Sequence, residues 1–340
     1  MIHNIRGIRV AILGDPHLGK AFVNGVPLDR RGEREQQQWY DFQLSLHDVE
    51  NADMHVNMGD IFDKMIVSPN VTLDAALEYI QAAQEHPDVT YVILRGNHDG
   101  SRDADQRASF DLFKAIVEPE RNILVVDQPG TCSNLGFVPW DPFKSAAELT
   151  RALGDDPLDA IFGHWDLDSF GDEQAPNLVP VGELLKRTDT VFNGHVHLPE
   201  TRYYDTDGHP VKSPQEAALT LHNVGSMQPY THAEDRSGER YVTLTLDQLQ
   251  ETDPAGLRDK CVRVLLQPGE ELPGDLECLQ LTGKPVSERD DTEDPNIEVE
   301  PQAFDFTQLF RKAFAQQGVR EDVRDEVWGY YQETTHAEET

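Results

Sequence analysis

Short apolar runs recur along the first 246 residues and predict the strands of an α/β domain. They lie at residues 8–13, 54–58, 90–94, 122–126, 135–140, 159–162, 189–192, 218–224 and 240–246. Helix-like stretches near residues 34–49 and from Thr72 onward separate the early runs. Strands that alternate with helices predict parallel βαβ units, and the helix-poor later half predicts mixed or antiparallel strands. We therefore expect an α/β fold with two packed mixed β-sheets flanked by helices.

The pattern changes after residue 248, which we take as the end of the main domain, 1–248. Residues 249–284 predict a small α+β cap, and the acidic stretch 285–302 predicts an exposed linker. Residues 303–333 predict a helical hairpin, which either packs on its own domain or fills a groove in a partner. Its apolar positions at helical spacing are Phe306, Leu309, Phe310, Phe314, Val323, Val327, Tyr330 and Tyr331.

Five of the predicted strands end in a glycine that is followed by side chains able to bind metals. The segments read GDPHLGK (14–20), GDIFDK (59–64), RGNHDG (95–100), GHWD (163–166) and GHVH (194–197). Any one of them alone is more typical of a turn with a surface histidine. Because the carboxyl ends of strands in an α/β sheet lie along one edge, the five loops together favour a single site. Its polar residues are Asp15, His17, Asp60, Asn97, His98, His164, His195 and His197.

The residue types at these positions indicate the chemistry. Imidazoles, carboxylates and one amide carbonyl, without a thiolate, suit Mn²⁺, Fe²⁺ or Zn²⁺ better than Ca²⁺ or a structural zinc. Seven of the eight side chains acting as ligands would exceed what one ion needs. A carboxylate can bridge two ions about 3.5–4 Å apart, and this two-metal arrangement recurs in phosphoester hydrolysis. A nearby histidine can then protonate the leaving oxygen.

The ordered motifs resemble the calcineurin-like metallophosphoesterase superfamily over about residues 8–200. Within it, DPHLGK, GDIFD, IFGHWDLDSF and NVGSMQPYTHAED followed by RYVTLTLD are similar to SbcD-type DNA-repair nucleases and the small subunits of phage recombination endonucleases. After residue 250 only the layout is similar. The resemblance implies the four-layer sandwich of that superfamily.

The resemblance also implies a role for each motif residue. Asp15, His17 and His197 would hold one metal, and Asn97, His164 and His195 a second, with Asp60 as the bridge. The implied ions are two Mn²⁺, which Mg²⁺, Fe²⁺ or Zn²⁺ can replace. His98 would be the catalytic histidine that is not a ligand, with Asp99 orienting its imidazole and Asp63 supporting the site. The alternative for Asp63 and Asp99 is that they cap the following turns.

The implied function is a Mn²⁺-dependent DNA exonuclease or endonuclease subunit with a two-metal mechanism. It would act in DNA repair, recombination or phage replication with an SbcC-type coiled-coil ATPase bound to the hairpin at 303–333. It would also form a homodimer through helices of the first 150 residues. The alternatives are another metallophosphoesterase, acting on phosphoproteins, nucleotides or cyclic nucleotides, and a structural subunit without catalysis.

Composition and the lack of a membrane span predict a cytoplasmic protein, in the host cytoplasm if it is viral, with an ordinary hydrophobic core. Hydrophobic residues make up 38% of the chain, enough for a core, and no run approaches the roughly 18 apolar residues of a membrane span. The first ten residues lack the apolar segment of a signal peptide. Cys132, Cys261 and Cys278 are an odd number at unrelated spacings, which indicates reduced thiols.

The net charge of −33 is the one feature that argues against a DNA enzyme, because the averaged field repels phosphates. Lys20, Lys64, Arg95 and Arg102 lie in or beside the motif loops and offer local attraction, although they are equally typical of an ordinary surface. The basic residues divide into 20 Arg and 9 Lys. An excess of acidic residues with few lysines is typical of proteins that work in concentrated salt, where screening limits electrostatic repulsion to short distances. We therefore hypothesise a halophilic host or virus.

Overall fold

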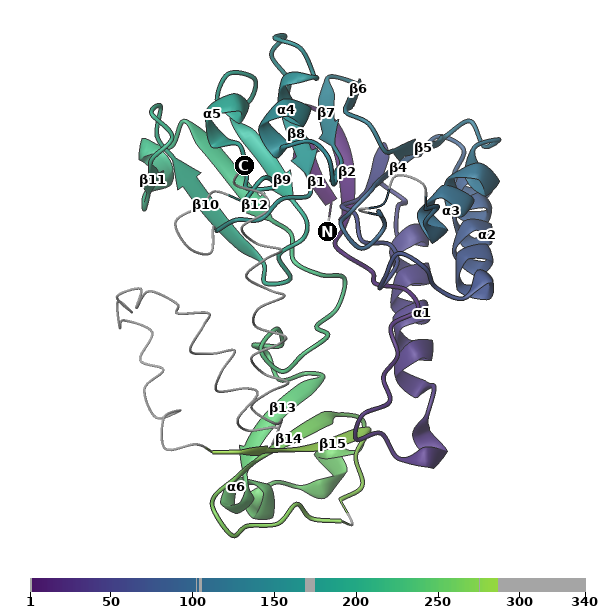
Figure 1. Cartoon of the computed structure of the whole chain (residues 1–340), viewed down its shortest axis with the longest axis vertical. Coiled ribbons are helices and arrows are strands. Elements are labelled where there is room, and N and C mark those ends of the chain that lie inside the picture. The colour runs from purple at the N-terminus through teal and green to yellow at the C-terminus, as the bar shows by residue number, and fades with distance from the viewer. Residues whose placement is uncertain (1, 102, 104–105, 169–174, 275, 287–340) are drawn as a thin grey trace, which may run out of the picture. The chain divides into compact units, whose positions relative to one another are not determined.

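The computed structural model describes residues 2–286, apart from 102, 104–105, 169–174 and 275 (Figure 1). Contacts divide the chain into residues 1–287 and residues 288–340. The predicted hairpin 303–333, most of the predicted linker 285–302 and Arg102 lie outside the described residues. All five motif segments lie in the first unit.

The first sheet has five strands in the order β1-β2-β3-β4-β5. Their bounds are β1 Ile2–Ile5, β2 Ile8–Leu13, β3 Met54–Asn57, β4 Thr90–Leu94 and β5 Ile123–Val126. β1 is antiparallel to β2, and all later pairs are parallel. Helices α1 (Glu33–His47), α2 (Pro69–Glu85) and α3 (Ser109–Val117) bury Phe42, Tyr79 and Phe113 in one cluster with β4 residues (Figure 1).

Helix α2 begins three residues before the expected position, Thr72. Pro69 occupies its first turn, with Ser68 as the preceding N-cap residue. Proline is favoured there because its missing N–H has no partner within the helix, and its φ is already helical. The apolar spacing alone does not reveal this turn.

The second sheet has seven strands in the order β11-β10-β12-β9-β8-β7-β6. Their bounds are β6 Gly130–Cys132, β7 Leu135–Val138, β8 Ala160–Gly163, β9 Thr190–Asn193, β10 Glu200–Tyr204, β11 Pro210–Val211 and β12 Leu219–Asn223. The four central strands β7, β8, β9 and β12 are parallel, and the outer strands are antiparallel. Helices α4 (Ala146–Arg151) and α5 (Val181–Leu184) pack on this sheet through Leu149 and Leu184.

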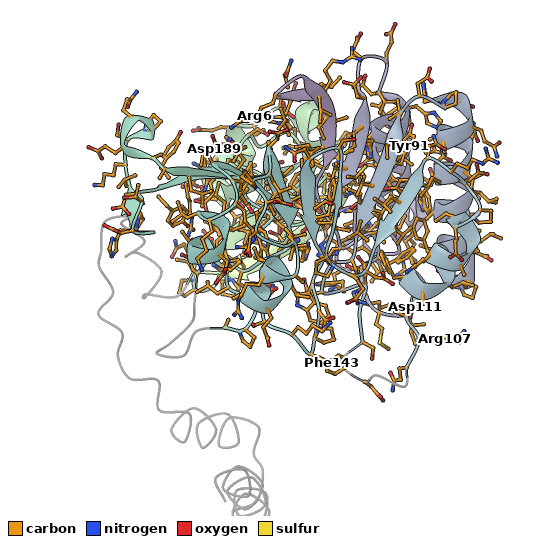
Figure 2. The ribbon with its side chains drawn as sticks, turned by 90° about the horizontal axis from the view of Figure 1, so that it is seen from above. Arg6, Tyr91, Arg107, Asp111, Phe143 and Asp189 are labelled. Carbon is orange, nitrogen blue, oxygen red and sulfur yellow. The ribbon has the colours of Figure 1, made fainter. Side chains whose placement is uncertain are left out.

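The two sheets pack face to face. Val10, Val56 and Val92 of the first sheet share an apolar cluster with Phe137, Phe162 and Phe192 of the second. Figure 2 shows Arg6 of the β1–β2 turn beside Asp189, and a hydrogen bond of 3.1 Å joins the Arg6 guanidinium to the Asp189 carboxylate. The layers run helices, sheet, sheet, helices, which confirms the predicted α/β fold.

A third sheet of three parallel strands consists of β13 (Tyr241–Thr245), β14 (Cys261–Leu266) and β15 (Gln280–Pro285). The short helices α6 (Leu246–Glu251) and η3 (Pro254–Leu257) connect β13 to β14. The run at 240–246, which the apolar pattern assigns to the main domain, pairs with β14 in this small sheet. The small sheet therefore begins upstream of the expected boundary at residue 249.

Two further features of the described residues bear on the expectations from composition. Cys132, Cys261 and Cys278 are all free thiols. Within the described ranges, no helix has both the length and the apolar character needed to cross a membrane. Two more 3₁₀ turns, η1 (Leu28–Arg30) and η2 (Pro214–Glu216), complete the assigned elements.

Candidate metal centre

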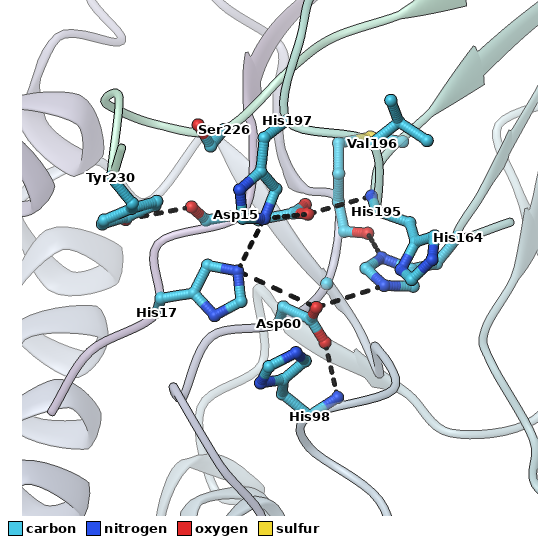
Figure 3. A network of polar contacts seen from close by, with 12 residues as sticks. Asp15, His17, Asp60, His98, His164, His195, Val196, His197, Ser226 and Tyr230 are labelled. Carbon is cyan, nitrogen blue, oxygen red and sulfur yellow. Dashed lines mark hydrogen bonds and ion pairs between the residues drawn. The ribbon is translucent and has the colours of Figure 1, made fainter. Parts of the chain in front are cut away.

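The five glycine-led loops meet at one place. They follow β2, β3 and β4 of the first sheet and β8 and β9 of the second. The carboxyl ends of the parallel strands of both sheets therefore contribute side chains, as Figure 3 shows for residues from both sheets. The single site that the motif pattern favours therefore lies where the edges of two packed sheets meet.

One group consists of Asp15, His17 and His197, whose ligand atoms lie within 4.8 Å of one another. The Nε2 atoms of His17 and His197 are 3.0 Å apart, and His197 Nε2 is 3.9 Å from Asp15 Oδ2 (Figure 3). Asp15 and His17 are buried. These are the three residues expected to share the first metal.

The second group consists of Asp60, His164 and His195, again within 4.8 Å. Asn97 belongs with it, because its Oδ1 is 3.0 Å from His164 Nε2 and 2.7 Å from His195 Nδ1. Asp60 Oδ2 is 3.4 Å from His164 Nε2 and 4.0 Å from His17 Nε2. The Asp60 carboxylate thus lies between the two groups, the position that a bridging ligand requires.

The donors at this centre fit two divalent cations. All of them are imidazole nitrogens or carboxylate and amide oxygens, the set that suits Mn²⁺, Fe²⁺ and Zn²⁺. Asp15 Oδ1 and His17 Nδ1 are buried without any hydrogen-bond partner. Buried polar atoms are normally satisfied, so the unpartnered Asp15 oxygen in particular fits a cation at this point.

The backbone at the centre is strained. His17, Asp60 and His195 have φ angles of 48°, 49° and 71°, in the left-handed region that non-glycine residues seldom adopt. Such strain collects at functional sites, where the surrounding structure imposes it. Here His17 N donates to Asp60 O at 2.9 Å and Leu18 N to Ile61 O at 2.8 Å, so the loops after β2 and β3 hold each other.

Two of the motif glycines are required by close approach. A Cβ on Gly96 would lie 2.1 Å from Asp60 Oδ1, well inside contact distance. Gly59 has a φ of +113°, and a Cβ there would lie 2.6 Å from His164 Nδ1. Gly59 and Gly96 therefore let the loops after β3 and β4 pack directly against neighbouring candidate ligands.

Three candidate ligands have a fixed ring orientation through their second nitrogen. His195 Nε2 is 2.7 Å from Asp166 Oδ1, and His197 Nδ1 is 3.3 Å from Glu234 Oε1. His164 Nδ1 is 2.9 Å from the carbonyl oxygen of Met58, to which it donates. A partner of this kind fixes the tautomer and leaves the other nitrogen free to bind a metal.

Sequence reasoning missed several of these supporting residues. Asp166 lies in the GHWD motif and Glu234 in the acidic stretch after the Gly-Ser segment, but neither is identified as a partner of a histidine. Gln38 of α1 donates to the carbonyl oxygens of Pro16 and His17, both at 2.8 Å. Tyr230 donates to the Asp15 carbonyl at 3.2 Å (Figure 3). Of these supporting residues, only Asp166 could have been identified from the sequence, because it lies within a motif.

Burial and mutual charge set the protonation of the centre. Burial lowers the pKa of His17 to about 3, so that ring is neutral and its lone pair is available. Burial raises the pKa of Asp15 to about 6. Burial would also raise the pKa of Asp60, but the neighbouring histidines, His164 above all, outweigh it and lower that pKa below its ordinary value. Asp60 therefore stays an anion at neutral pH.

His98 lies at the centre without belonging to either expected ligand set. Its backbone N–H donates to Asp60 Oδ1 at 2.8 Å, and its Nδ1 is 2.5 Å from the carbonyl oxygen of Asp63. The His98 ring stands edge-on to His17, with centroids 4.7 Å apart. Its placement agrees with a histidine that acts on the reaction from beside the metals.

The Asp99 carboxylate is bound to backbone N–H groups of the loops after β3 and β4. This buried carboxylate accepts hydrogen bonds from the backbone N–H groups of Ile61, Phe62 and Gly96 at 3.0–3.2 Å. Among the described residues, the orienting contact to the His98 imidazole comes from the Asp63 carbonyl instead. Asp99 thus joins two loops, the turn-stabilising alternative, and its burial raises its pKa to about 7.

The basic residues near the motifs are mostly paired with acids. Lys20 Nζ is 3.0 Å from Asp63 Oδ1, and Arg95 Nη2 is 3.3 Å from Asp141 Oδ2. Lys64 is exposed and has no ion pair with another residue in the described ranges. Among Lys20, Lys64 and Arg95, the expected cations that lie in the described residues, Lys64 is therefore the one without a compensating acid there.

Comparison with known families agrees with this geometry. A family model described as calcineurin-like phosphoesterase matches residues 8–199. That span contains every candidate ligand, from Asp15 to His197. Among curated proteins, none matches the chain.

Proposed function

The chain belongs to the calcineurin-like phosphoesterases, and from this premise we propose that it is a Mn²⁺-dependent DNA nuclease. Membership implies a metal-dependent phosphoester hydrolase of a family that binds two divalent metal ions. The observation that carries phosphoester hydrolysis is the pair of ligand groups joined by Asp60, with His98 beside them.

Two groups of side chains are expected to hold the two ions. They are Asp15, His17 and His197, then Asn97, His164 and His195, with Asp60 shared. When bound, divalent cations supply Lewis acidity that attracts phosphoryl oxygens and offsets charge in the transition state. The ionised Asp60 and the neutral His17 enter that arrangement without first releasing a proton.

His98 is suited to move the proton. A carbonyl oxygen only accepts, so the contact with Asp63 O fixes the His98 proton on Nδ1. Nε2 is then the atom that holds a second proton and gives it to the leaving oxygen. The Asp60 carboxylate accepts from the His98 backbone N–H and keeps this residue beside the centre.

Several features support DNA over a small phosphoester. The GHWD motif, whose Asp166 carboxylate holds His195, and the segment around Tyr230 and Glu234 are similar to those of SbcD-type nucleases. We further propose an SbcC-type ATPase as partner of residues 303–333, a homodimer, and a cytoplasmic role in repair, recombination or phage replication. A phosphatase would not require the acidic linker and hairpin.

The direct test compares substrates under Mn²⁺. Purified full-length protein should degrade linear DNA faster than it hydrolyses phosphomonoesters or nucleotides. His98→Ala should abolish DNA cleavage while the bound Mn²⁺ per chain stays the same. His209→Ala, at a histidine whose side chain is 76% exposed, is the control and should cleave like the wild type. Turnover of phosphomonoesters but not DNA would reject the nuclease and favour a phosphatase.

The partner proposal has its own test. A chain ending at residue 302 should keep cleavage of short single-stranded DNA but lose complex formation with an SbcC-type ATPase in size-exclusion chromatography. Complex formation that survives the truncation would refute the role of residues 303–333. Sedimentation of the full chain at two concentrations tests the homodimer.

We propose that the acidic surface reflects a salt-rich host. With a net charge of −33, self-repulsion weakens as the Debye length falls to about 3 Å in 1 M salt. The thermal midpoint should rise from 0.1 M to 2 M KCl, and DNA cleavage should persist there. A midpoint that is highest in dilute buffer would reject this proposal.

A further inference from the structure

A second cluster of metal-binding side chains lies where α1 and α2 end. His47 is the last residue of α1, Glu85 is the last residue of α2, and His86 is its C-cap. One ligand atom from each of the three lies within 4.8 Å of the others. None of these residues belongs to a motif or to the candidate metal centre. We propose that they form a separate site for a divalent transition metal of the Zn²⁺ class.

His47 is oriented as a metal ligand should be. Its Nε2 is 3.1 Å from Glu78 Oε1, and its Nδ1 is 3.0 Å from Glu85 Oε2. With the proton on Nε2 donated to Glu78, the Nδ1 lone pair faces Glu85 and, within the same cluster, His86. This is the carboxylate–histidine–metal arrangement in which the outer carboxylate fixes the tautomer and raises the basicity of the ring.

Both carboxylates are themselves held in place. Gln43 donates to the second oxygen of Glu78 at 2.8 Å, and Gln81 donates to the second oxygen of Glu85 at 2.9 Å. Each carboxylate therefore presents one fixed oxygen to His47. An incidental surface ion pair does not require such support, because exposed side chains gain little from a single fixed geometry.

The electrostatics of the position favour a cation. Two helices end here, and the unpaired carbonyl groups at each carboxyl end carry partial negative charge. The Glu78 and Glu85 carboxylates add to it, and an imidazole that binds a metal does so as a neutral ligand. No Lys or Arg forms an ion pair with Glu78 or Glu85 among the described residues. The site thus offers net negative charge to a bound ion.

The ligand types indicate which ion. Two imidazole nitrogens with one carboxylate oxygen suit Zn²⁺, Co²⁺ or Ni²⁺ better than Mg²⁺ or Ca²⁺, which prefer oxygen. Glu85 is exposed and both histidines are half-buried, so water completes the coordination. A metal here would tie the end of α1 to the end of α2 and stabilise their packing.

The experiment measures Zn²⁺ per chain in the full-length protein after chelation, reloading and equilibrium dialysis. Wild type should bind one Zn²⁺ per chain more than either the His86→Gln or the His47→Gln variant. Zn²⁺ should also raise the thermal midpoint of wild type more than that of either variant. The matched control is His3→Gln, on β1 and outside every group of potential metal ligands in the described residues, and it should bind as many ions as wild type.

Two further results decide the proposal. Glu78→Gln keeps all three ligands and should lower the Zn²⁺ affinity of this site about tenfold, as expected for an outer partner. Cleavage by the Mn²⁺-loaded His86→Gln variant should equal that of wild type, since the site is separate from the centre. Equal Zn²⁺ content in wild type, His47→Gln and His86→Gln would show that His47 only forms an ion pair. If His47→Gln does not fold, equal content in His86→Gln alone overturns the site.

Discussion

Replacing Asp166 with asparagine tests whether the histidines of the centre depend on their outer partners. Asp166 Oδ1 is 2.7 Å from His195 Nε2, and the opposite nitrogen of that ring is 2.7 Å from Asn97 Oδ1. The hydrogen bond to His195 lowers the pKa of Asp166, so the carboxylate is charged at neutral pH. It fixes the proton on Nε2 and leaves Nδ1 for the metal. In Asp166→Asn the charge is lost, and the amide can donate to Nε2 and favour the wrong tautomer.

The expected cost follows from this geometry. Loss of an outer partner typically weakens metal binding or activity about 10–100-fold, or about 1.4–2.7 kcal/mol. Because the Asp166 side chain is 34% exposed, solvent screens part of the interaction, and we expect the lower end, about tenfold. The apparent dissociation constant for Mn²⁺ should rise by this factor, while the hydrolysis rate at saturating Mn²⁺ should be close to that of wild type.

The assay titrates Mn²⁺ against hydrolysis of a chromogenic phosphodiester. The control is Asp168→Asn, the same change two residues later. The Asp168 carboxylate is paired with Arg202 at 2.8 Å and makes no contact with His195. The Asp168→Asn variant should therefore need the same Mn²⁺ concentration for hydrolysis as wild type. If Asp166→Asn needs no more Mn²⁺ than Asp168→Asn, the reasoning about outer partners is wrong.

Two other predictions concern packing and pH. Gly96→Ala would place a Cβ 2.1 Å from Asp60 Oδ1, so bound Mn²⁺ per chain should fall, whereas Gly130→Ala, with nothing within 4 Å, should not change it. Burial lowers the pKa of His55 to about 3 from an ordinary 6.5, so below pH 6.5 only the unfolded chain gains this proton and stability falls. His55 should thereby remove about 2 kcal/mol from the free energy of unfolding between pH 8 and pH 5. Urea unfolding at the two pH values should show a smaller loss for His55→Gln than for His209→Gln; an equal loss would contradict the assignment.

Much of the centre can be predicted from the sequence because strand ends constrain where side chains lie. Asp60 and His164 are far apart in the chain, yet each follows a buried parallel strand by one glycine. Chain topology then leaves few places where these loops can go. The pattern does not say which strand belongs to which of the two expected sheets, since apolar residues such as Phe162 and Phe192, which form the face-to-face packing, would fit either sheet.

The supporting residues could not be predicted in the same way. Gln38 lies on the buried side of α1, where helical spacing alone leads one to expect an apolar residue, and its amide serves two carbonyls of the loop after β2. Glu234 follows no strand and contacts His197 only because the chain folds back there. The contacts of single polar residues such as these depend on how distant segments pack together. The local sequence pattern carries no information about that packing.

Asp99 shows most clearly why a motif does not fix the contacts of its residues. It follows a motif glycine, and its carboxylate is the group expected to orient the His98 imidazole. The Asp99 carboxylate has its acceptor positions taken by three backbone N–H groups, which would otherwise be buried without partners. The His98 ring is held by the carbonyl of residue 63, a group that every residue type carries. No side-chain identity at position 63 encodes that contact. The orientation of the proton donor is therefore a property of the backbone conformation after β3, which Asp99 itself helps to fix.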